Sequence, residues 1–342
     1  MAHYVGLDVS LEETSVCVVD EQGHKVWQGK TASTPRAIAR TIKARAPEAV
    51  KIGFETGPLA TWHWHGLKEL GLPVVCLDAR QAKAALSMQI NKTDANDALG
   101  LAQVVRTGWY REVEVKSMEA HLVRSLVVAR ARLVEIRTKL SNHLRGILKT
   151  FGLVVGKAHG RSFERRVREM VVGKVELGGI IESLLTVWRG TCEQIQVLEK
   201  QLRQHAYHSE VCRRLMTVPG VGPVTAVAYT AVIDDPGRFR RSSSVGAYLG
   251  LTPRRYQSGE VDRSGRISKC GDGMLRSYLY EAASVILSRV PRWSKLKAWG
   301  ARLARRVGIK KARVAVARKL AVIMHRIWVD GTEFRWSNPQ TT

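Results

Sequence analysis

The chain has 342 residues, of which 45% are hydrophobic, and a formal net charge of +25. This length suffices for two or three domains, and this apolar content supports buried cores, so an intrinsically disordered chain is excluded. No apolar run reaches the roughly 18 residues that a membrane span needs, so we also exclude a transmembrane protein.

The positive charge is concentrated in the rear of the chain. Residues 1–115 carry 13 Lys and Arg against 13 Asp and Glu, residues 116–210 carry 17 against 9, and residues 211–342 carry 25 against 8. We take these three segments as three domains. A neutral front and a basic rear predict that nucleic acid binds mainly to the rear domain, because basic patches attract phosphate.

The five cysteines form no C-x-x-C pair, and their odd number argues against a disulfide framework and against a Cys-ligated zinc site. The N-terminus lacks the basic and apolar regions of a signal peptide. Both observations predict a protein of the reducing cytoplasm. The cysteines are Cys17, Cys76, Cys192, Cys212 and Cys270, and we interpret Cys270, which has no obvious base near it, as structural.

The front domain begins with β-rich runs and continues with strands that alternate with helices. This order is typical of an α/β domain with a mixed sheet. The expected strands are 4–9, 14–20, 24–29, 50–55 and 73–78, and the expected helices are 37–46, 59–70 and 94–105.

Four carboxylates of this domain are candidate metal ligands. Asp8 interrupts an apolar strand and Glu55 ends another, and a buried carboxylate is costly unless it is paired or binds metal. Asp94 and Asp97 begin a helix three residues apart, so they face the same way. Taken singly, Asp94 reads as an N-cap, Asp97 as a first-turn charge and Glu55 as a loop residue. Together they predict a site for Mg²⁺, or alternatively Mn²⁺, acting on a phosphodiester.

The alternative interpretation of this domain is a kinase. Sugar and acetate kinases of the actin-like fold begin with a similar strand and aspartate pattern. They need a Gly- and Thr-rich phosphate turn directly after the first aspartate. Residues 9–14 contain no glycine and place two acids there, and the chain lacks a second, adenine-binding half. The sequence therefore disfavours a kinase.

The middle segment is helical. Apolar residues recur at spacings of four and three over 120–148, close to a heptad pattern, and a second helix is expected over 180–202. We expect an antiparallel helical hairpin or coiled coil that can also pair protomers. The alternative is a plain helical core within one chain.

The rear segment contains a match to a helix-hairpin-helix over 215–226. Its turn, Pro219-Gly-Val-Gly222, is expected to present the backbone N–H groups of Gly220 and Gly222 to a DNA phosphate. Helices are also expected over 242–249, 271–288 and 295–324. The last of these is strongly basic, which favours binding to a nucleic-acid backbone.

Residues 250–271 are polar, basic and rich in Gly and Ser, and they show no sustained helix or strand period, so we expect an ordered loop. Ser258 follows two arginines whose guanidinium groups suit phosphate oxygens. A serine is a poor nucleophile until it is activated, so Ser258 is either a nucleophile or one more donor to DNA. The basic residues expected to contact nucleic acid here are Arg254, Arg255, Arg263, Arg266 and Lys269.

The four acids, the P-G-V-G turn and the run G-L-T-P-R-R-Y-Q-S-G make the chain resemble the DEDD-type transposases of the insertion-sequence 110 family, recombinases guided by a bridge RNA. The resemblance implies an α/β RuvC-like (ribonuclease H-like) front domain, a helical coiled-coil spacer and a mostly α rear transposase domain with a helix-hairpin-helix. The residues at the four acidic positions are Asp8, Glu55, Asp94 and Asp97, and Ser258 stands at the nucleophile position.

In this family the implied reaction is attack of Ser258 on DNA phosphorus, helped by the metal-bound acids, with a phosphoserine link that allows religation. The implied partners are donor DNA, target DNA and a guide RNA, and the expected state is a homo-oligomer (dimer or tetramer) without membrane association. We expect a prokaryotic protein of the cytoplasm, held at the nucleoid when on DNA. Two alternatives stay open, which are a metal-only junction nuclease and a non-enzymatic scaffold.

Overall fold

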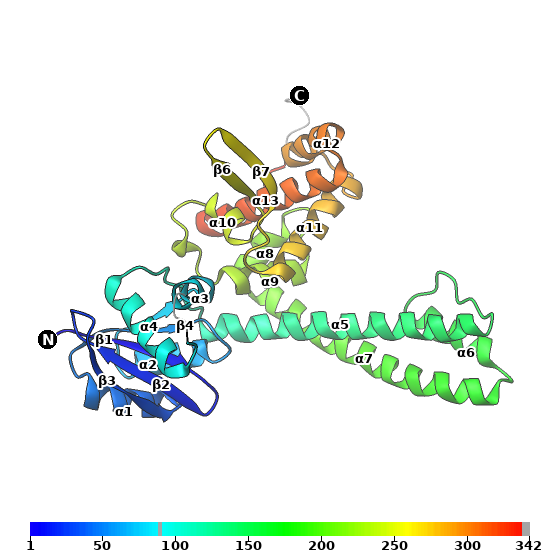
Figure 1. Cartoon of the computed structure of the whole chain (residues 1–342). Helices are drawn as coiled ribbons and strands as arrows, with labels where there is room; N and C mark the ends of the chain where they lie inside the picture. Colours follow the sequence, from blue (N-terminus) through cyan, green and yellow to red (C-terminus); the bar gives the residue numbers. More distant parts are fainter. Residues whose placement is uncertain (88–90, 337–342) are drawn as a thin grey trace. The chain divides into compact units, whose positions relative to one another are not determined.

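A computed structural model describes residues 1–87 and 91–336. The chain divides into two compact units, Met1–Met118 and a second unit that begins at Glu119 (Figure 1). In the described part of the chain, no helix combines the length and the apolar composition that crossing a membrane requires.

The first unit is built on a five-stranded mixed sheet with the strand order β3-β2-β1-β4-β5. The first three strands form an antiparallel meander, and β4 and β5 continue the sheet in parallel with β1. The mixed sheet predicted from the sequence is therefore present. Its strands are β1 (His3–Val9), β2 (Glu13–Val19), β3 (Lys25–Ala32), β4 (Ala49–Glu55) and β5 (Val74–Leu77).

Helices cover both faces of this sheet. Val5 and Leu7 of the central strand β1 point into a core shared with α1 (Pro35–Arg45) and α2 (Ala60–Glu69). The opposite face packs against α3 (Ala79–Leu86) and α4 (Asp94–Thr107). Because side chains alternate along a strand, residues next to Val5 and Leu7 face α4.

Glycines on β1 and β4 allow α4 to lie directly on the sheet. A Cβ on Gly6 would stand 2.1 Å from the carbonyl oxygen of Ala98, and a Cβ on Gly53 would stand 2.1 Å from Cγ2 of Val105. These separations are far below van der Waals contact. The absence of a side chain at both positions therefore sets how close the helix lies to the two strands that carry the candidate acids.

The second unit begins with two long helices joined through α6 (Arg161–Val171), namely α5 (Met118–Thr150) and α7 (Val175–His208). Arg130 of α5 forms an ion pair with Glu199 of α7 at 2.6 Å, and Trp188 Nε1 of α7 donates to Ser141 Oγ at 2.8 Å. Residues further along α5 therefore contact residues earlier in α7, so the two helices are antiparallel, as predicted.

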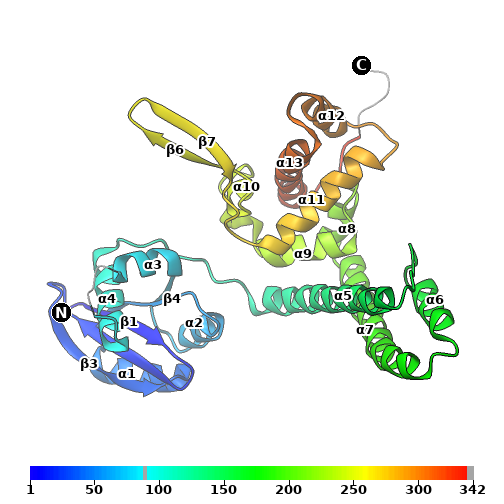
Figure 2. The same ribbon diagram turned by 45° about the vertical axis from the view of Figure 1, so that its right-hand side comes forward.

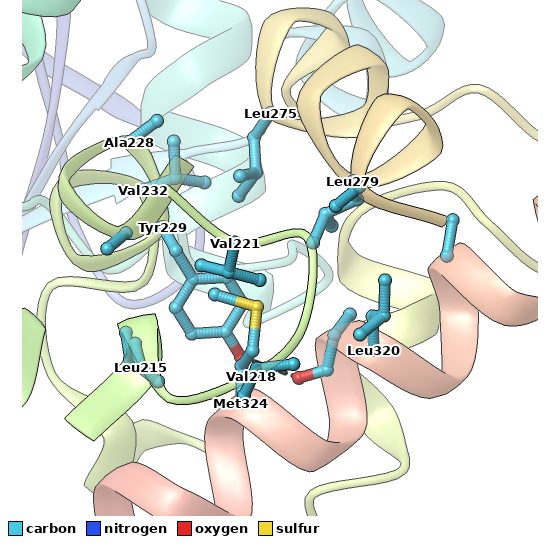
Figure 3. Packing of buried hydrophobic residues seen from close by; sticks show 14 of the residues in the cluster. Leu215, Val218, Val221, Ala228, Tyr229, Val232, Leu275, Leu279, Leu320 and Met324 are labelled. Carbon is cyan, nitrogen blue, oxygen red and sulfur yellow. Dashed lines mark hydrogen bonds between the residues drawn. The ribbon is translucent and has the colours of Figure 1, made fainter. Parts of the chain in front are cut away.

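The remainder of the second unit is a helical domain around a single core (Figure 3). Its centre is Tyr229, which is fully buried and donates its hydroxyl proton to the carbonyl oxygen of Ala321 at 2.7 Å. The helices are α8 (Glu210–Met216), α9 (Pro223–Ile233), α10 (Ser244–Tyr248), α11 (Gly273–Ser288), α12 (Lys295–Val307) and α13 (Ile309–Asp330), with a 3-10 turn, η1 (Pro236–Arg238).

Two predictions for this domain were wrong. The single helix expected over 295–324 is two helices, because Gly308 between α12 and α13 has a φ of +86°, a non-helical conformation that glycine adopts readily. The loop expected over 250–271 contains a β-hairpin, β6 (Pro253–Ser258) and β7 (Val261–Ile267). It projects from its domain (Figure 2) with nearly every residue exposed, so no buried face imposes an apolar alternation on its sequence.

Candidate active site

Asp8 and Glu55 lie on neighbouring parallel strands, near their carboxyl ends. Leu7 pairs with Phe54 across β1 and β4, so the two acids occupy the next row of the sheet. Each acid follows a glycine by two residues and therefore shares that glycine's face of the sheet, which is the face that α4 covers. The structure thus brings both predicted carboxylates to one edge, under the start of α4.

Asp94 and Asp97 lie in the first turn of α4, as predicted. The N-cap is Thr93, whose side-chain oxygen accepts from the backbone N–H of Asn96, so the reading of Asp94 as the cap is wrong. Asp94 Oδ2 instead lies 3.6 Å from Nζ of Lys30. Because Thr93 satisfies the helix terminus, both carboxylates remain available for other partners.

The negative charges of the three other candidate acids act on Asp8. The pKa of Asp8 is raised from its ordinary value of 3.8 to about 6, mainly by burial. The nearby carboxylates that raise it further are, in order of effect, Asp97, Asp94 and Glu55. Burial and then Asp97 also raise the pKa of Glu55, and Lys92 opposes both shifts. The repulsion means that a cation at this edge would be stabilised.

The carboxylate oxygens of the four acids are ligands of the type that hard divalent cations prefer. Within residues 1–87 and 91–336, the carboxylates of Asp8, Glu55 and Asp97 accept no hydrogen bond and form no ion pair, so the positive charge of Lys92 offsets their repulsion only in part. In the same residues no three His, Cys, Asp or Glu side chains lie close enough to form a ready metal cluster. Mg²⁺ and Mn²⁺ prefer carboxylate oxygens, and these four acids are the residues that would hold them.

Ser258 ends β6 beside the turn residues Gly259 and Glu260, and it is exposed. Arg255 donates from Nε and from its terminal nitrogen to the two oxygens of Asp262, at 2.8 and 2.7 Å, and Arg254 donates to the carbonyl oxygen of Ser268 at 3.2 Å. Both arginines predicted to meet phosphate thus have protein partners. Arg263, Arg266 and Lys269 are exposed on the same hairpin and the segment that follows it.

The glycine turn predicted over 219–222 joins α8 to α9. Gly220 has a φ of +82° and faces α11, where a Cβ would stand 2.7 Å from the carbonyl oxygen of Ala282. Gly222 precedes α9 and is exposed, and nothing lies within 4 Å of the position that a Cβ would take. Gly220 is therefore needed for packing, and the Gly222 side of the turn is the part that remains accessible to a phosphate.

The structure adds four residues to the acidic site that the sequence patterns did not single out. Gly6 and Gly53 admit α4, and Lys30 and Lys92 supply the nearby positive charge. A signal for the glycines was present, since both acids end a Gly-x-Asp or Gly-x-Glu triplet in a strand, where glycine often marks a close approach of another segment. No local pattern pointed to Lys30.

A mixed α/β unit whose Asp8 is influenced by three other acids, followed by a basic helical unit with an exposed serine, is the organisation expected of a DEDD-type transposase. Residues 5–152 match the family described as "Transposase" of the DEDD IS110 type, and residues 212–298 match the "Transposase IS116/IS110/IS902 family". The chain belongs to this IS110 family of insertion-sequence transposases.

Relatives with these names span most of the chain. It is 29% identical to the transposase for insertion sequence element IS1111A of Coxiella burnetii, over 94% of this chain and 88% of that protein. It is 30% identical to a probable family 20 transposase of Pseudomonas aeruginosa, over 83% of each chain. A shorter match, 31% identical over 33% of this chain and 35% of the relative, is to the pilin gene-inverting protein of Moraxella lacunata.

Proposed function

We propose that this transposase is an RNA-guided recombinase that cuts and rejoins DNA with two chemical groups, the metal-binding acids of the first unit and Ser258 of the second. The observation that carries the proposal is that the pKa of Asp8 is raised to about 6, mainly by burial and further by the repulsion of three nearby carboxylates. Structural carboxylates are ordinarily paired, whereas a metal site tolerates such repulsion because the ion offsets it.

In the proposed reaction Ser258 Oγ bonds to the scissile phosphorus while the bond from phosphorus to the 3′ oxygen breaks. The serine proton passes to a carboxylate of the acidic site, and the leaving 3′ oxygen takes up a proton. A bound Mg²⁺ or Mn²⁺ would supply charge stabilisation at the phosphate. The DNA 5′ phosphate stays on Ser258 as a phosphodiester, so a 3′ hydroxyl of another strand reverses the step without ATP.

This chemistry requires the acidic site and the hairpin to meet, within one chain or between protomers. A homo-oligomer is favoured by α5, where Leu122 and Ile136 from the predicted heptad pattern are 73% and 39% exposed. Apolar residues left on one side of a long helix suit pairing with another copy. Donor DNA, target DNA and a bridge-type guide RNA complete the proposed assembly, which acts in the prokaryotic cytoplasm.

The test is a search for a covalent protein–DNA adduct. The protein is expressed with its native flanking DNA so that any guide RNA is present, then denatured and digested with nuclease and trypsin. A nucleotide remnant is expected on the peptide of residues 256–263, which contains Ser258 and no other serine. Asp8→Ala should remove the adduct, whereas Ser264→Ala, a matched change on the same hairpin, should retain it.

The second candidate is a metal-only junction nuclease in which Ser258 binds DNA. It is favoured by the surroundings of Ser258, since no described residue hydrogen-bonds to its hydroxyl and none is placed as its base. This candidate predicts Mg²⁺-dependent nicks that persist in Ser258→Ala and no adduct in the wild type. Such a result would replace the serine mechanism.

A further inference from the structure

A groove of about 2030 Å³ lies in the second unit, between the foot of the β6–β7 hairpin, the segment 240–243 and the helices α12 and α13. We call it the basic groove. One wall is formed by residues 264–267 of β7, the strand that returns from the tip where Ser258 lies. The groove is therefore continuous with the hairpin that carries the proposed nucleophile.

The rim of the basic groove is strongly positive. Nine cationic side chains line it against a single carboxylate, Asp330. Apart from Lys295, none of these cations forms an ion pair with a residue in the described ranges, so the positive charge is not neutralised by the protein. A concave surface with this imbalance attracts a polyanion. The nine are Arg240, Arg241, Arg266, Lys269, Lys295, Lys311, Arg318, Lys319 and Arg326.

Most of the less exposed residues that line the groove are apolar, and we call these apolar residues its floor. They limit the kind of polyanion that fits. Trp299 lies there, and the Nζ of Lys319 stands 4.1 Å from the centre of its ring. Intact duplex DNA presents phosphates and sugars outward and would leave such a floor unused. Unpaired nucleotides expose base faces, and these stack on aromatic and apolar side chains while their phosphates stay with the cations. The apolar lining includes Leu251, Leu296, Val314, Val322 and Ile323.

We propose that the basic groove binds an unpaired strand of DNA, with its bases against the Trp299 floor and its phosphates on the cationic rim. The proposal rests on the proposed function in one respect, because Ser258 attacks DNA and the groove wall leads from Ser258. A DNA strand that separates from its complement at the hairpin tip is bound in the groove before or after cleavage. The groove thus selects locally melted DNA over an intact duplex.

Two adjacent lysines provide a matched test by fluorescence anisotropy. Lys311 lines the groove, whereas Lys310, which is also exposed at the start of the same helix, does not. The probe is a labelled single-stranded DNA of about 12 nucleotides, bound to the full chain in EDTA. Lys311→Glu should weaken binding about 10-fold or more, and Lys310→Glu less than about 3-fold. Equal losses in the two variants would overturn the proposal.

Photocrosslinking locates the strand directly. A single-stranded DNA with 5-iododeoxyuridine should modify Trp299, in the tryptic peptide of residues 298–302, more than the exposed Trp293, in residues 293–295, which lies outside the groove. Modification of Trp293 alone would contradict the assignment. Preference of the groove for duplex DNA, or for single-stranded RNA by about 10-fold, would also contradict it. The binding is measured in EDTA, where no metal-dependent cleavage occurs, so its failure is separate from failure of the serine mechanism.

Discussion

The acidic site and the β6–β7 hairpin position their side chains by different means. Asp8 and Glu55 are held by buried strands, and α4 lies on the sheet at Gly6 and Gly53. Ser258 stands on a two-stranded ribbon whose residues are exposed and which packs on no core at its tip. Bringing several carboxylates together, as in the acidic site, costs free energy and requires a rigid scaffold. A nucleophile on an exposed ribbon, in contrast, can reach a substrate.

The largest expected effect comes from Asp8→Asn. Removing one ligand charge from the acidic site should lower DNA cleavage at least about 1,000-fold, because a metal contributes several kcal/mol to phosphodiester chemistry. Asn keeps the size of the side chain and removes the repulsion by Asp97, so the fold should be retained. Cleavage is measured on a supercoiled target with the circular dichroism spectrum as control. A variant with unchanged cleavage would remove the metal site from the mechanism.

The second prediction concerns the packing of α4 against the sheet next to the acids. Gly6→Val places a side chain where a Cβ alone would meet the Ala98 oxygen at 2.1 Å and the Ala102 nitrogen at 2.3 Å. Displacing α4 should cost about 3 kcal/mol of unfolding free energy in the first unit and separate Asp97 from Asp8. Gly57→Ala is the control, since nothing lies within 4 Å of its Cβ position. Urea denaturation should separate the two variants, and equal midpoints would refute this account of α4.

The third prediction concerns the pH dependence of folding stability. Asp8 has a pKa of about 6 in the folded chain and 3.8 ordinarily, so the folded state binds the extra proton between these values. Its contribution to stability is therefore present below pH 4 and is lost as the pH rises to 6. In EDTA at pH 7, Asp8→Asn should be more stable than wild type by about 1–2 kcal/mol. The gap should close at pH 4, and Mg²⁺ or Mn²⁺ should raise the Tm of wild type alone.

The sequence predicted the candidate residues of both sites but not the structure of the hairpin. Asp8 was found because a carboxylate in an apolar strand is a strong signal, and Ser258 because of the basic residues around it. The hairpin was missed because an exposed ribbon has no buried face to impose alternation. The pairing of Arg255 with Asp262 depends on strand register, since Asp262 stands opposite Gln257 and Arg255 reaches it diagonally. The roles of these residues in catalysis stay predictions.

The smallest expected effect concerns this diagonal pair. Arg255 and Asp262 are 65% and 50% exposed, so their ion pair contributes little to stability and opens readily. The hydrogen bonds from Arg255 nonetheless hold the pKa of Asp262 below its ordinary value and occupy the guanidinium. Asp262→Ala should free Arg255 for phosphate and tighten DNA binding about 3-fold, while Arg255→Ala should weaken it by a similar factor.

The double variant distinguishes competition from simple charge counting. If Asp262 acts by occupying Arg255, removing both side chains should give the same affinity as Arg255→Ala alone, because no guanidinium remains to be released. If Asp262 acts only as a repelling charge, the double variant should bind more tightly than Arg255→Ala by the full effect of Asp262→Ala. Affinities measured at two salt concentrations separate the cases, since a released arginine adds a phosphate contact and steepens the salt dependence. The first outcome would show that the ion pair between Arg255 and Asp262 limits how tightly the hairpin binds DNA.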